Sequence, residues 1–386
     1  METTNLKLPQ LVERLQGQNV QKADFVVPAQ LISMKEGRII FPFDEIGQVL
    51  AQAGINTDSN LSLEIMDVFH GGICDKLGIP RNYYNKMVGT HNALRDENVN
   101  HWLQNVGGNI MVRTFVDRVT NTGYARALLS DRYELIDNYD VLIAALTAIR
   151  ETGLNVVVDV ADITERKMYV RFTCPDIEIQ APELMKHYRN PNTGGVGSGV
   201  VLGFIISNSE VGQGTFSIAP RLTWKVCNNG MIVTADAYNR THLGARKEVS
   251  SITWSEETKT KTLELVCSQV KDAIKYFATA DYLSGKVQKI MDLNNPIEHP
   301  ADTIRVISKE LTFTEAQEKS VLDYFIKSGD MTSFGVVQAI TFHAHADNDA
   351  DARYDIESAS ENLIEKVNKA DKVLVQKTVK ELVTAN

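Results

Sequence analysis

The chain has few cysteines and no long hydrophobic run. Its cysteines are Cys74, Cys174, Cys227 and Cys267, and no two of them stand in a Cys-x-x-Cys spacing. This pattern argues against a zinc knuckle, a thioredoxin-like dithiol and a disulfide framework. The longest apolar run, residues 200–206, is too short to span a bilayer. We therefore expect a soluble protein whose thiols stay reduced in a cytoplasm, with no membrane partner.

The chain also lacks an excess of basic charge, internal repeats and low-complexity segments. Its 40 Lys and Arg against 49 Asp and Glu give a net charge of −9, which argues against a histone-like protein coated in cations. The first residues, Met1–Lys7, contain no apolar core segment, so we expect no secretory signal. A hydrophobic fraction of 43% is ordinary for a globular protein, and 386 residues suffice for two or three domains.

The first part of the chain predicts a hairpin among helices. A short helix is expected over 8–15, and a hairpin pairs 25–32 with 38–43 across a Lys-Glu-Gly turn. Apolar side chains at helical spacing predict helices over 61–106. We therefore treat residues 1–106 as an N-terminal hairpin and helical region.

The middle of the chain predicts a β-β-α-β-β unit. Strand-like segments cover 110–119 and 124–135, a helix is expected over 139–150, and further strands cover 156–163 and 168–173. More strands follow in the segment that leads to an Asn-Asn-Gly turn.

The pattern after Trp254 is helical throughout. We therefore divide the chain into the region 1–106, a central β-rich domain over 107–253 and a helical C-terminal region over 254–386. Strands that follow one another through short turns favour antiparallel pairing. The fold class is predicted as α+β: a mostly antiparallel sheet with helices before it and a helical C-terminal region.

Basic charge collects in residues 185–247, here called the basic strip. Seven Lys and Arg stand there against two acidic residues, with aromatic residues between them. Cations for phosphates and rings for bases are what single-stranded nucleic acid requires. The predicted nucleic-acid contacts are Lys186, Arg189, Arg221, Trp224, Lys225, Tyr238, Arg240, Arg246 and Lys247.

An alternative interpretation places the same residues in ordinary structural roles. Trp224 alternates with Leu222 and Val226 and so fits a core position. Arg221 and Lys225 fit solvated charges on a strand edge, which discourage aggregation.

The glycine-rich segment 190–199 resembles a phosphate-binding loop in composition. It lacks the Lys-Ser or Lys-Thr pair of a P-loop, and it precedes a strand, whereas a dinucleotide-binding loop follows one and opens a helix. We therefore predict a mobile loop, of which Gly194–Gly199 could fold over a ligand.

A run with His343, His345 and Asp347 has the composition of a metal site. As a calcium loop that begins at Asp347 it fails, because Ala352 stands where glycine is required and Ser358 where glutamate is required. The two histidines share a face only in an extended segment, and the helical pattern disfavours that. We expect no metal and no other cofactor.

Cys227 and His242 are candidates for a thiol–imidazole pair, with Asn228 or Asn239 to orient the ring. A small thiol at a strand end is also ordinary as a buried packing residue. We expect no catalytic residue and treat these two as weak candidates.

Several short motifs occur in a fixed order over roughly residues 60–360. They are Leu77–Tyr84, Asn98–Leu103, Leu129–Tyr133 with Ile136–Asn138, Ser207–Glu210 with Gly212, Cys227–Met231, and Gln338–Thr341. Together they resemble the phage/plasmid-like family, DUF932. The resemblance implies a mobile-element protein of phages or plasmids that acts in a bacterial cytoplasm, in DNA metabolism or against host defence. It implies no catalytic residues.

Three hypotheses follow. The first is a non-enzymatic DNA-binding protein that prefers single strands and assists recombination or replication as a homo-oligomer. The β-β-α-β-β unit resembles, at the level of fold, phage single-strand annealing proteins, which carry a basic groove across a sheet. The second is an interaction protein that captures a host factor or a small ligand. The third is a hydrolase that uses Cys227 and His242.

Overall fold

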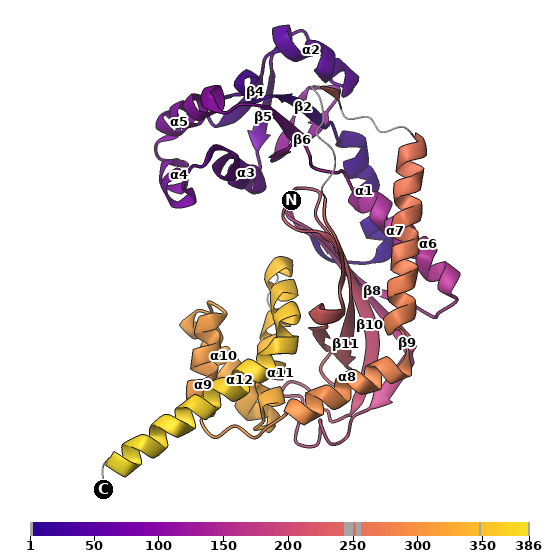
Figure 1. Cartoon of the computed structure of the whole chain (residues 1–386), viewed down its shortest axis with the longest axis vertical. Coiled ribbons are helices and arrows are strands. Elements are labelled where there is room, and N and C mark those ends of the chain that lie inside the picture. The colour runs from indigo at the N-terminus through magenta and orange to yellow at the C-terminus, as the bar shows by residue number, and fades with distance from the viewer. Residues whose placement is uncertain (1–2, 243–249, 252–255, 347–348, 385–386) are drawn as a thin grey trace.

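The computed structural model describes residues 3–242, 250–251, 256–346 and 349–384. In this part of the chain, two sheets and twelve α-helices form an α+β fold (Figure 1). The predicted fold class is confirmed, including the helical region after Trp254.

The first sheet, here called the central sheet, has the strand order β1-β8-β9-β10-β11-β12, and β13 pairs with β11. All of its pairs are antiparallel. Its strands are β1 (Thr3–Leu6), β8 (Val157–Ile163), β9 (Met168–Gln180), β10 (Gly199–Asn208), β11 (Phe216–Trp224), β12 (Asn229–Ile232) and β13 (Tyr238–Arg240).

The second sheet, here called the N-terminal sheet, has the order β14-β2-β6-β7-β5-β4-β3. It is antiparallel except where β5 runs parallel to β7. Its strands are β2 (Phe25–Pro28), β3 (Ser33–Lys35), β4 (Arg38–Phe41), β5 (Leu61–Ile65), β6 (Asn109–Asp117), β7 (Thr122–Ser130) and β14 (Ser250–Ser251).

Two details differ from the sequence prediction. Residues 61–65 are a strand and not the start of a helix, because Leu61 and Leu63 alternate with Ser62 and Glu64 and only the leucines are buried. The elements of the β-β-α-β-β unit form, but β6 and β7 pair within the N-terminal sheet and β8 and β9 within the central sheet. The expected boundary at residue 106 therefore runs through the N-terminal sheet.

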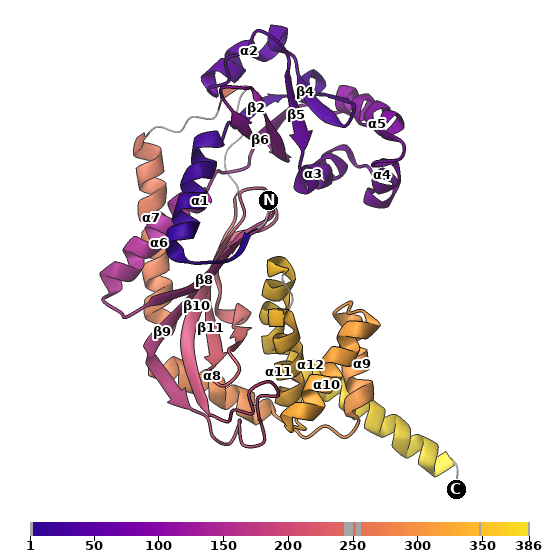
Figure 2. The same cartoon turned by 180° about the vertical axis from the view of Figure 1, so that it is seen from behind.

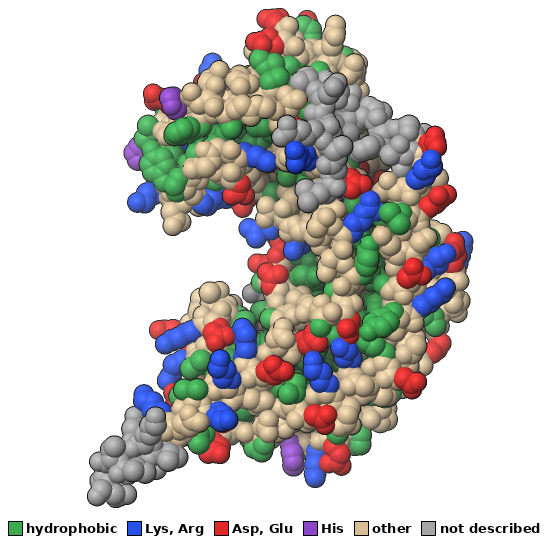
Figure 3. Space-filling model, viewed as in Figure 1, with side chains coloured by type: hydrophobic (Ala, Val, Ile, Leu, Met, Phe, Trp, Pro, Cys, Tyr) green, Lys and Arg blue, Asp and Glu red, His purple; other side chains and the backbone are tan. Residues whose placement is uncertain are grey.

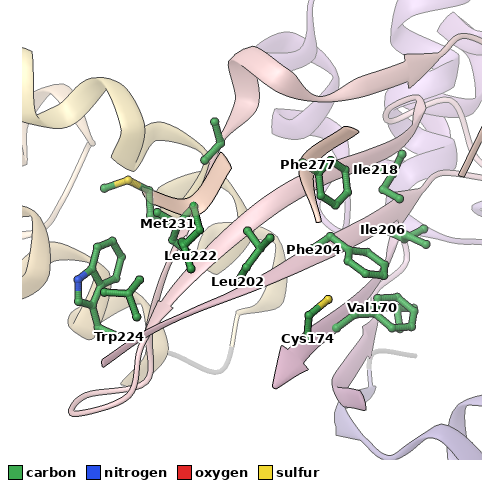
Figure 4. Close-up of a cluster of buried hydrophobic side chains, with 14 of the residues drawn as sticks. Val170, Cys174, Leu202, Phe204, Ile206, Ile218, Leu222, Trp224, Met231 and Phe277 are labelled. Carbon is green, nitrogen blue, oxygen red and sulfur yellow. The ribbon is translucent and has the colours of Figure 1, made fainter. Parts of the chain in front are cut away.

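The two faces of the central sheet pack against different helices. On one face, Phe204 lies against Phe277 of α7 with ring centroids 5.9 Å apart, and Leu202 and Leu222 belong to the same cluster (Figure 4). On the other face, Ile205 and several other side chains of the sheet pack against the start of α12. Because successive side chains of a strand point to opposite faces, every second residue of β9, β10 and β11 faces one layer of helices and the residues between them face the other. The helices near the first face are α1 (Leu8–Gln21), α6 (Asn138–Thr152), α7 (Glu256–Phe277) and α8 (Ala280–Leu293).

The remaining helices form two arms. Those of the N-terminal arm are α2 (Phe43–Gln52), α3 (Asp67–Leu77), α4 (Arg81–Met87) and α5 (Asn92–Asn105), and those of the C-terminal arm are α9 (Pro300–Glu310), α10 (Glu315–Ser328), α11 (Ser333–Ala346) and α12 (Ala350–Thr384). Figures 1 and 2 show that the central sheet joins the arms into a C shape. The space-filling view shows the hollow that the arms enclose (Figure 3).

Candidate ligand site between the two sheets

A buried carboxylate joins the two sheets. Glu210 follows β10 and is 2% exposed. Lys22 Nζ lies 2.8 Å from its Oε1 and Arg126 Nη2 lies 2.8 Å from its Oε2, while the backbone N–H of Asn138 donates to Oε1 at 2.7 Å. Burial alone would raise the pKa of Glu210, but Lys22, Arg126 and Arg113 hold it well below its ordinary value. The carboxylate is therefore charged at neutral pH.

Arg113 of β6 completes this group of charges. Its guanidinium donates to Asp24 Oδ2 at 2.7 Å, to Asp137 Oδ1 at 2.7 Å and to the backbone oxygen of Glu210 at 2.9 Å. Burial opposes its charge, yet these three acidic residues raise the pKa of Arg113 above its ordinary value. We call the whole group the Glu210 centre. It contains Lys22, Asp24, Arg113, Arg126, Asp137 and Glu210, so its cations and carboxylates balance.

A cavity of about 680 Å³ opens beside the Glu210 centre. Its wall comes from α1, from the turn between β8 and β9, from the end of β5 and from β6 and β7. Glu210, Arg126 and Asn138 lie on it, so the cavity reaches the junction of the two sheets. Thr3 also lines it, which places it beside the N-terminus marked in Figure 1.

Arg126 is a lining residue with unused hydrogen-bonding capacity. It is 7% exposed, and its guanidinium carbon lies 3.9 Å from the centroid of the Phe115 ring. Nη2 donates to Glu210, but Nη1 is buried and has no hydrogen-bond partner among the described residues. A buried donor without an acceptor costs about 1–3 kcal/mol, so this atom marks a place for an acceptor.

Motifs that carry the family resemblance meet in space around this centre. Asn208 Nδ2 donates to the Ile136 oxygen and to Asn138 Oδ1, each at 2.9 Å. Tyr133 donates through its hydroxyl to the Ser209 oxygen at 2.7 Å. The sequence analysis quoted these segments but did not predict their contact. The signal in the sequence that could have indicated this contact is that these segments carry polar residues beside strand ends.

Two residues of the basic strip lie inside the protein. Arg221 is 4% exposed and donates through Nη2 to Glu357 Oε1 at 2.9 Å. Trp224 is 1% exposed, and its ring lies 5.2 Å from that of Phe334. The prediction that they contact nucleic acid needs correction, because both faces of β11 are covered by helices. For Trp224 the structure agrees with the alternative interpretation.

The remaining described residues of the strip fall into two groups. Lys186, Arg189 and Lys225 are exposed. Arg189 Nη1 approaches the Gly194 oxygen at 3.4 Å, and Lys225 N donates to the Gly199 oxygen at 3.0 Å, so these cations flank the glycine-rich loop.

Tyr238 and Arg240 are half-buried and lie at the other end of β11, where Arg240 pairs with Glu134 at 3.1 Å. The strip therefore spans the length of β11 and does not form one continuous patch. Arg246 and Lys247 lie outside the described residues.

Cys227 and His242 do not form a catalytic pair. Cys227 follows the end of β11, whereas His242 follows β13, which pairs with the start of β11. The strand between them has nine residues and is therefore roughly 26 Å long. Cys227 Sγ approaches Gln338 Oε1 at 3.4 Å, and burial raises the pKa of its thiol to about 11. Burial lowers the pKa of His242 to about 4. The hydrolase hypothesis therefore loses its nucleophile–base pair.

The predicted metal residues point to different neighbours. His343 packs edge-on against Phe313 with ring centroids 5.5 Å apart, whereas His345 Nε2 lies 2.8 Å from Glu357 Oε1. Both stand on α11, where residues two apart point in directions about 200° apart. Within the described residues, no three His, Cys, Asp or Glu side chains form a group that could hold a metal. Asp347 lies outside those residues.

The fold and the cavity define a two-sheet α+β protein with a candidate ligand site at the junction of its sheets. No family model, no curated protein and no solved structure matches the chain. Of the helices described, none combines the length and the apolar sequence that a membrane crossing requires.

Proposed function

We propose that the protein binds a small ligand in the cavity between its two sheets. The observation that carries this proposal is the cavity itself: about 680 Å³, reaching a charged centre to which both sheets contribute. Ligand pockets commonly enclose about 300–1,000 Å³ and combine apolar walls with a few placed polar groups. This corresponds to the second hypothesis from the sequence, with a different site from the glycine-rich loop.

The chemistry of the Glu210 centre supports the proposal. Well-packed apolar residues often join two elements as stably as a buried group of ion pairs does. Charged residues at this junction are therefore not required for stability alone. Their position on the wall of a cavity favours a role in binding.

Gly17 offers a direct test of the cavity. It lies on α1 in the cavity wall, and a Cβ atom added there meets nothing within 4 Å. Gly17→Trp should fill the cavity, whereas Gly17→Ala adds only a methyl group and serves as the matched control. The probe is the fluorescence of 8-anilinonaphthalene-1-sulfonate. Binding by the unaltered protein and the alanine variant, but not by the tryptophan variant, is expected. Equal binding by all three would reject the cavity as the ligand site.

A second candidate function is binding of single-stranded DNA at the glycine-rich loop. Two exposed cations, Arg189 and Lys225, contact this loop, and Lys186 is a further exposed cation shortly before it in the chain, and that observation favours it. Membership of the phage/plasmid-like family, action in recombination or replication, assembly as a homo-oligomer and a bacterial cytoplasmic location belong to this second proposal. They rest on the sequence motifs quoted above.

Fluorescence anisotropy on labelled oligonucleotides over a salt series tests the second candidate. Replacing Lys186, Arg189 and Lys225 by Gln should reduce the slope of log affinity against log salt by about 2, since each phosphate contact to a single strand contributes about 0.7. Arg240→Gln, at the other end of β11, is the control. An unchanged slope in the triple variant would reject this site.

A further inference from the structure

The cavity also indicates the chemical class of its ligand. Building on the proposed function, we infer that the ligand carries a phosphate or carboxylate group that binds Arg126 and a planar ring that packs on Tyr124. Nucleoside monophosphates and small aryl acids share this chemistry. Three features indicate this chemistry: the free donor of Arg126, the way its guanidinium is held, and the ring that faces the same cavity.

The guanidinium of Arg126 is prepared to receive an anion. Glu210 holds Nη2 at 2.8 Å, and the Phe115 ring supports the guanidinium plane, so its orientation is fixed before any ligand arrives. Nη1 remains without a partner among the described residues. A guanidinium matches the oxygens of a carboxylate or phosphate in geometry and charge. The charges of the Glu210 centre balance, so the place for an anion is set by this free donor and its fixed direction and not by a surplus of positive charge.

The charged residues at the rim of the cavity do not by themselves favour an anionic or a cationic ligand. Arg14, Arg166 and Lys167 line the cavity, but so do Glu13, Asp67 and Glu165. These six charges balance, and exposed charges are screened by salt. The preference for an anion therefore rests on the buried Arg126 and should persist at moderate ionic strength.

An aromatic ring lies close to this cation. Tyr124 of β7 is directly opposite Phe115 of β6 in the strand register, and both line the cavity. Tyr124 is 39% exposed, so a ligand can reach its ring, and Ile65 and Met66 add apolar surface beside it. Planar rings gain from offset stacking on such a side chain. A ligand with a ring and an anionic group would use both features at once.

Isothermal titration calorimetry with four probes separates the contribution of the anionic group from that of the ring. Adenosine monophosphate and benzoate carry ring and anion, adenosine carries the ring alone, and inorganic phosphate carries the anion alone. We expect one of the first two to bind at least about tenfold more tightly than adenosine, since a hydrogen bond to a charged group contributes that much. Which of them binds distinguishes a phosphate ligand from a carboxylate ligand.

Two variants assign the contacts. Arg126→Lys keeps the charge beside Glu210 but lacks the second arm of the guanidinium, and should weaken the anionic probe by about tenfold while leaving adenosine unchanged. Tyr124→Ala should weaken every probe that has a ring. Lys319→Arg, an exposed exchange of the same two residue types on α10, is the control. Thermal unfolding of each variant checks that it is folded. If Arg126→Lys does not fold, Tyr124→Ala still tests the site.

The outcomes separate this inference from the proposed function. If Gly17→Trp blocks the fluorescent probe but Arg126→Lys changes no affinity, the cavity binds ligands and the anion assignment is wrong. If adenosine binds as tightly as adenosine monophosphate and benzoate, or if none of the four probes binds, the inference is overturned. If Gly17→Trp has no effect on the fluorescent probe, the proposed function itself fails.

Discussion

At the residue scale, a carboxylate with several buried partners dominates the junction of the sheets. Glu210→Gln should lower the free energy of unfolding by about 3–5 kcal/mol, because Arg126 would remain buried without its counter-charge and Lys22 would keep only Asp137. Urea denaturation measures this. Glu178→Gln, which removes a partly exposed pair with Lys225, is the control and should change stability by less than about 1 kcal/mol. Equal effects of the two variants would contradict the role given to Glu210.

The same carboxylate predicts sensitivity to strong acid. The pKa of Glu210 is lower in the folded than in the unfolded state, so the unfolded state takes up a proton first as the pH falls. Its contribution is therefore complete above its ordinary pKa of 4.5 and declines below it.

His242 predicts a loss of stability at milder pH. Its ring stacks on Tyr133 with centroids 5.0 Å apart, and burial lowers its pKa from 6.5 to about 4. As the pH falls through 6.5 the unfolded state is protonated first, so up to about 3 kcal/mol should be lost between pH 6.5 and 4.

His242→Phe keeps a ring on Tyr133 and should flatten this pH dependence in urea denaturation at pH 7 and pH 5. Burial also lowers the pKa of His70 to about 4, so His70 should account for the part of the pH dependence that remains in this variant. His101→Phe, an exposed change on α5, should leave the slope of the unaltered protein. A slope that His242→Phe does not reduce would contradict the assignment.

At the element scale, one glycine permits the central strands to pair. Gly203 lies on β10 between β9 and β11, and a Cβ atom there would collide with the backbone oxygen of Phe172. Gly203→Ala should therefore destabilise the protein by about 3 kcal/mol or more. Gly17→Ala is the matched control, since α1 has open space at that position and alanine favours a helix by about 0.5–1 kcal/mol. Thermal unfolding of both variants should show opposite shifts.

Local patterns predicted many elements, but not their partners. The helix expected over 139–150 corresponds to α6, and Gly153 ends it with a positive φ of 72°. Which strands pair depends on segments far apart in the chain, and no local periodicity encodes that. Arg221 shows that the same holds for individual side chains. Its place next to Leu222 in the strand puts it on the other face of the sheet, but its partner Glu357 stands 136 residues away in the chain. The cavity was not predicted because its wall comes from several distant segments.

At the scale of the whole molecule, α12 is fastened to the central sheet by a buried carboxylate. Glu357 is fully buried, accepts from Arg221 at 2.9 Å and lies 3.6 Å from Arg171. Burial alone would raise its pKa, but these arginines hold it well below its ordinary value. The C-terminal arm therefore depends on an interaction inside the protein.

Glu357→Gln should loosen that arm. Two buried arginines would lose a counter-charge, at a cost of about 3–5 kcal/mol. Thermal unfolding measures the loss, and limited proteolysis should cut α12 faster than in the unaltered protein. Glu310→Gln, which breaks an exposed pair with Lys366, is the control and should have little effect on either measurement. Unchanged proteolysis of the Glu357 variant would show that apolar packing alone holds α12.

The path of the chain between the sheets has a consequence for synthesis on the ribosome. The chain begins in the central sheet with β1, builds most of the N-terminal sheet from β2 to β7, returns for β8 to β13, and supplies β14 to the N-terminal sheet last. Among the described strands, the central sheet is complete only when β13 has left the exit tunnel, and the N-terminal sheet only when β14 has. Sheets with many distant pairings also form slowly. A nascent chain of this protein therefore keeps unpaired strand edges until β13 and β14 have emerged, and those edges are natural targets for chaperones.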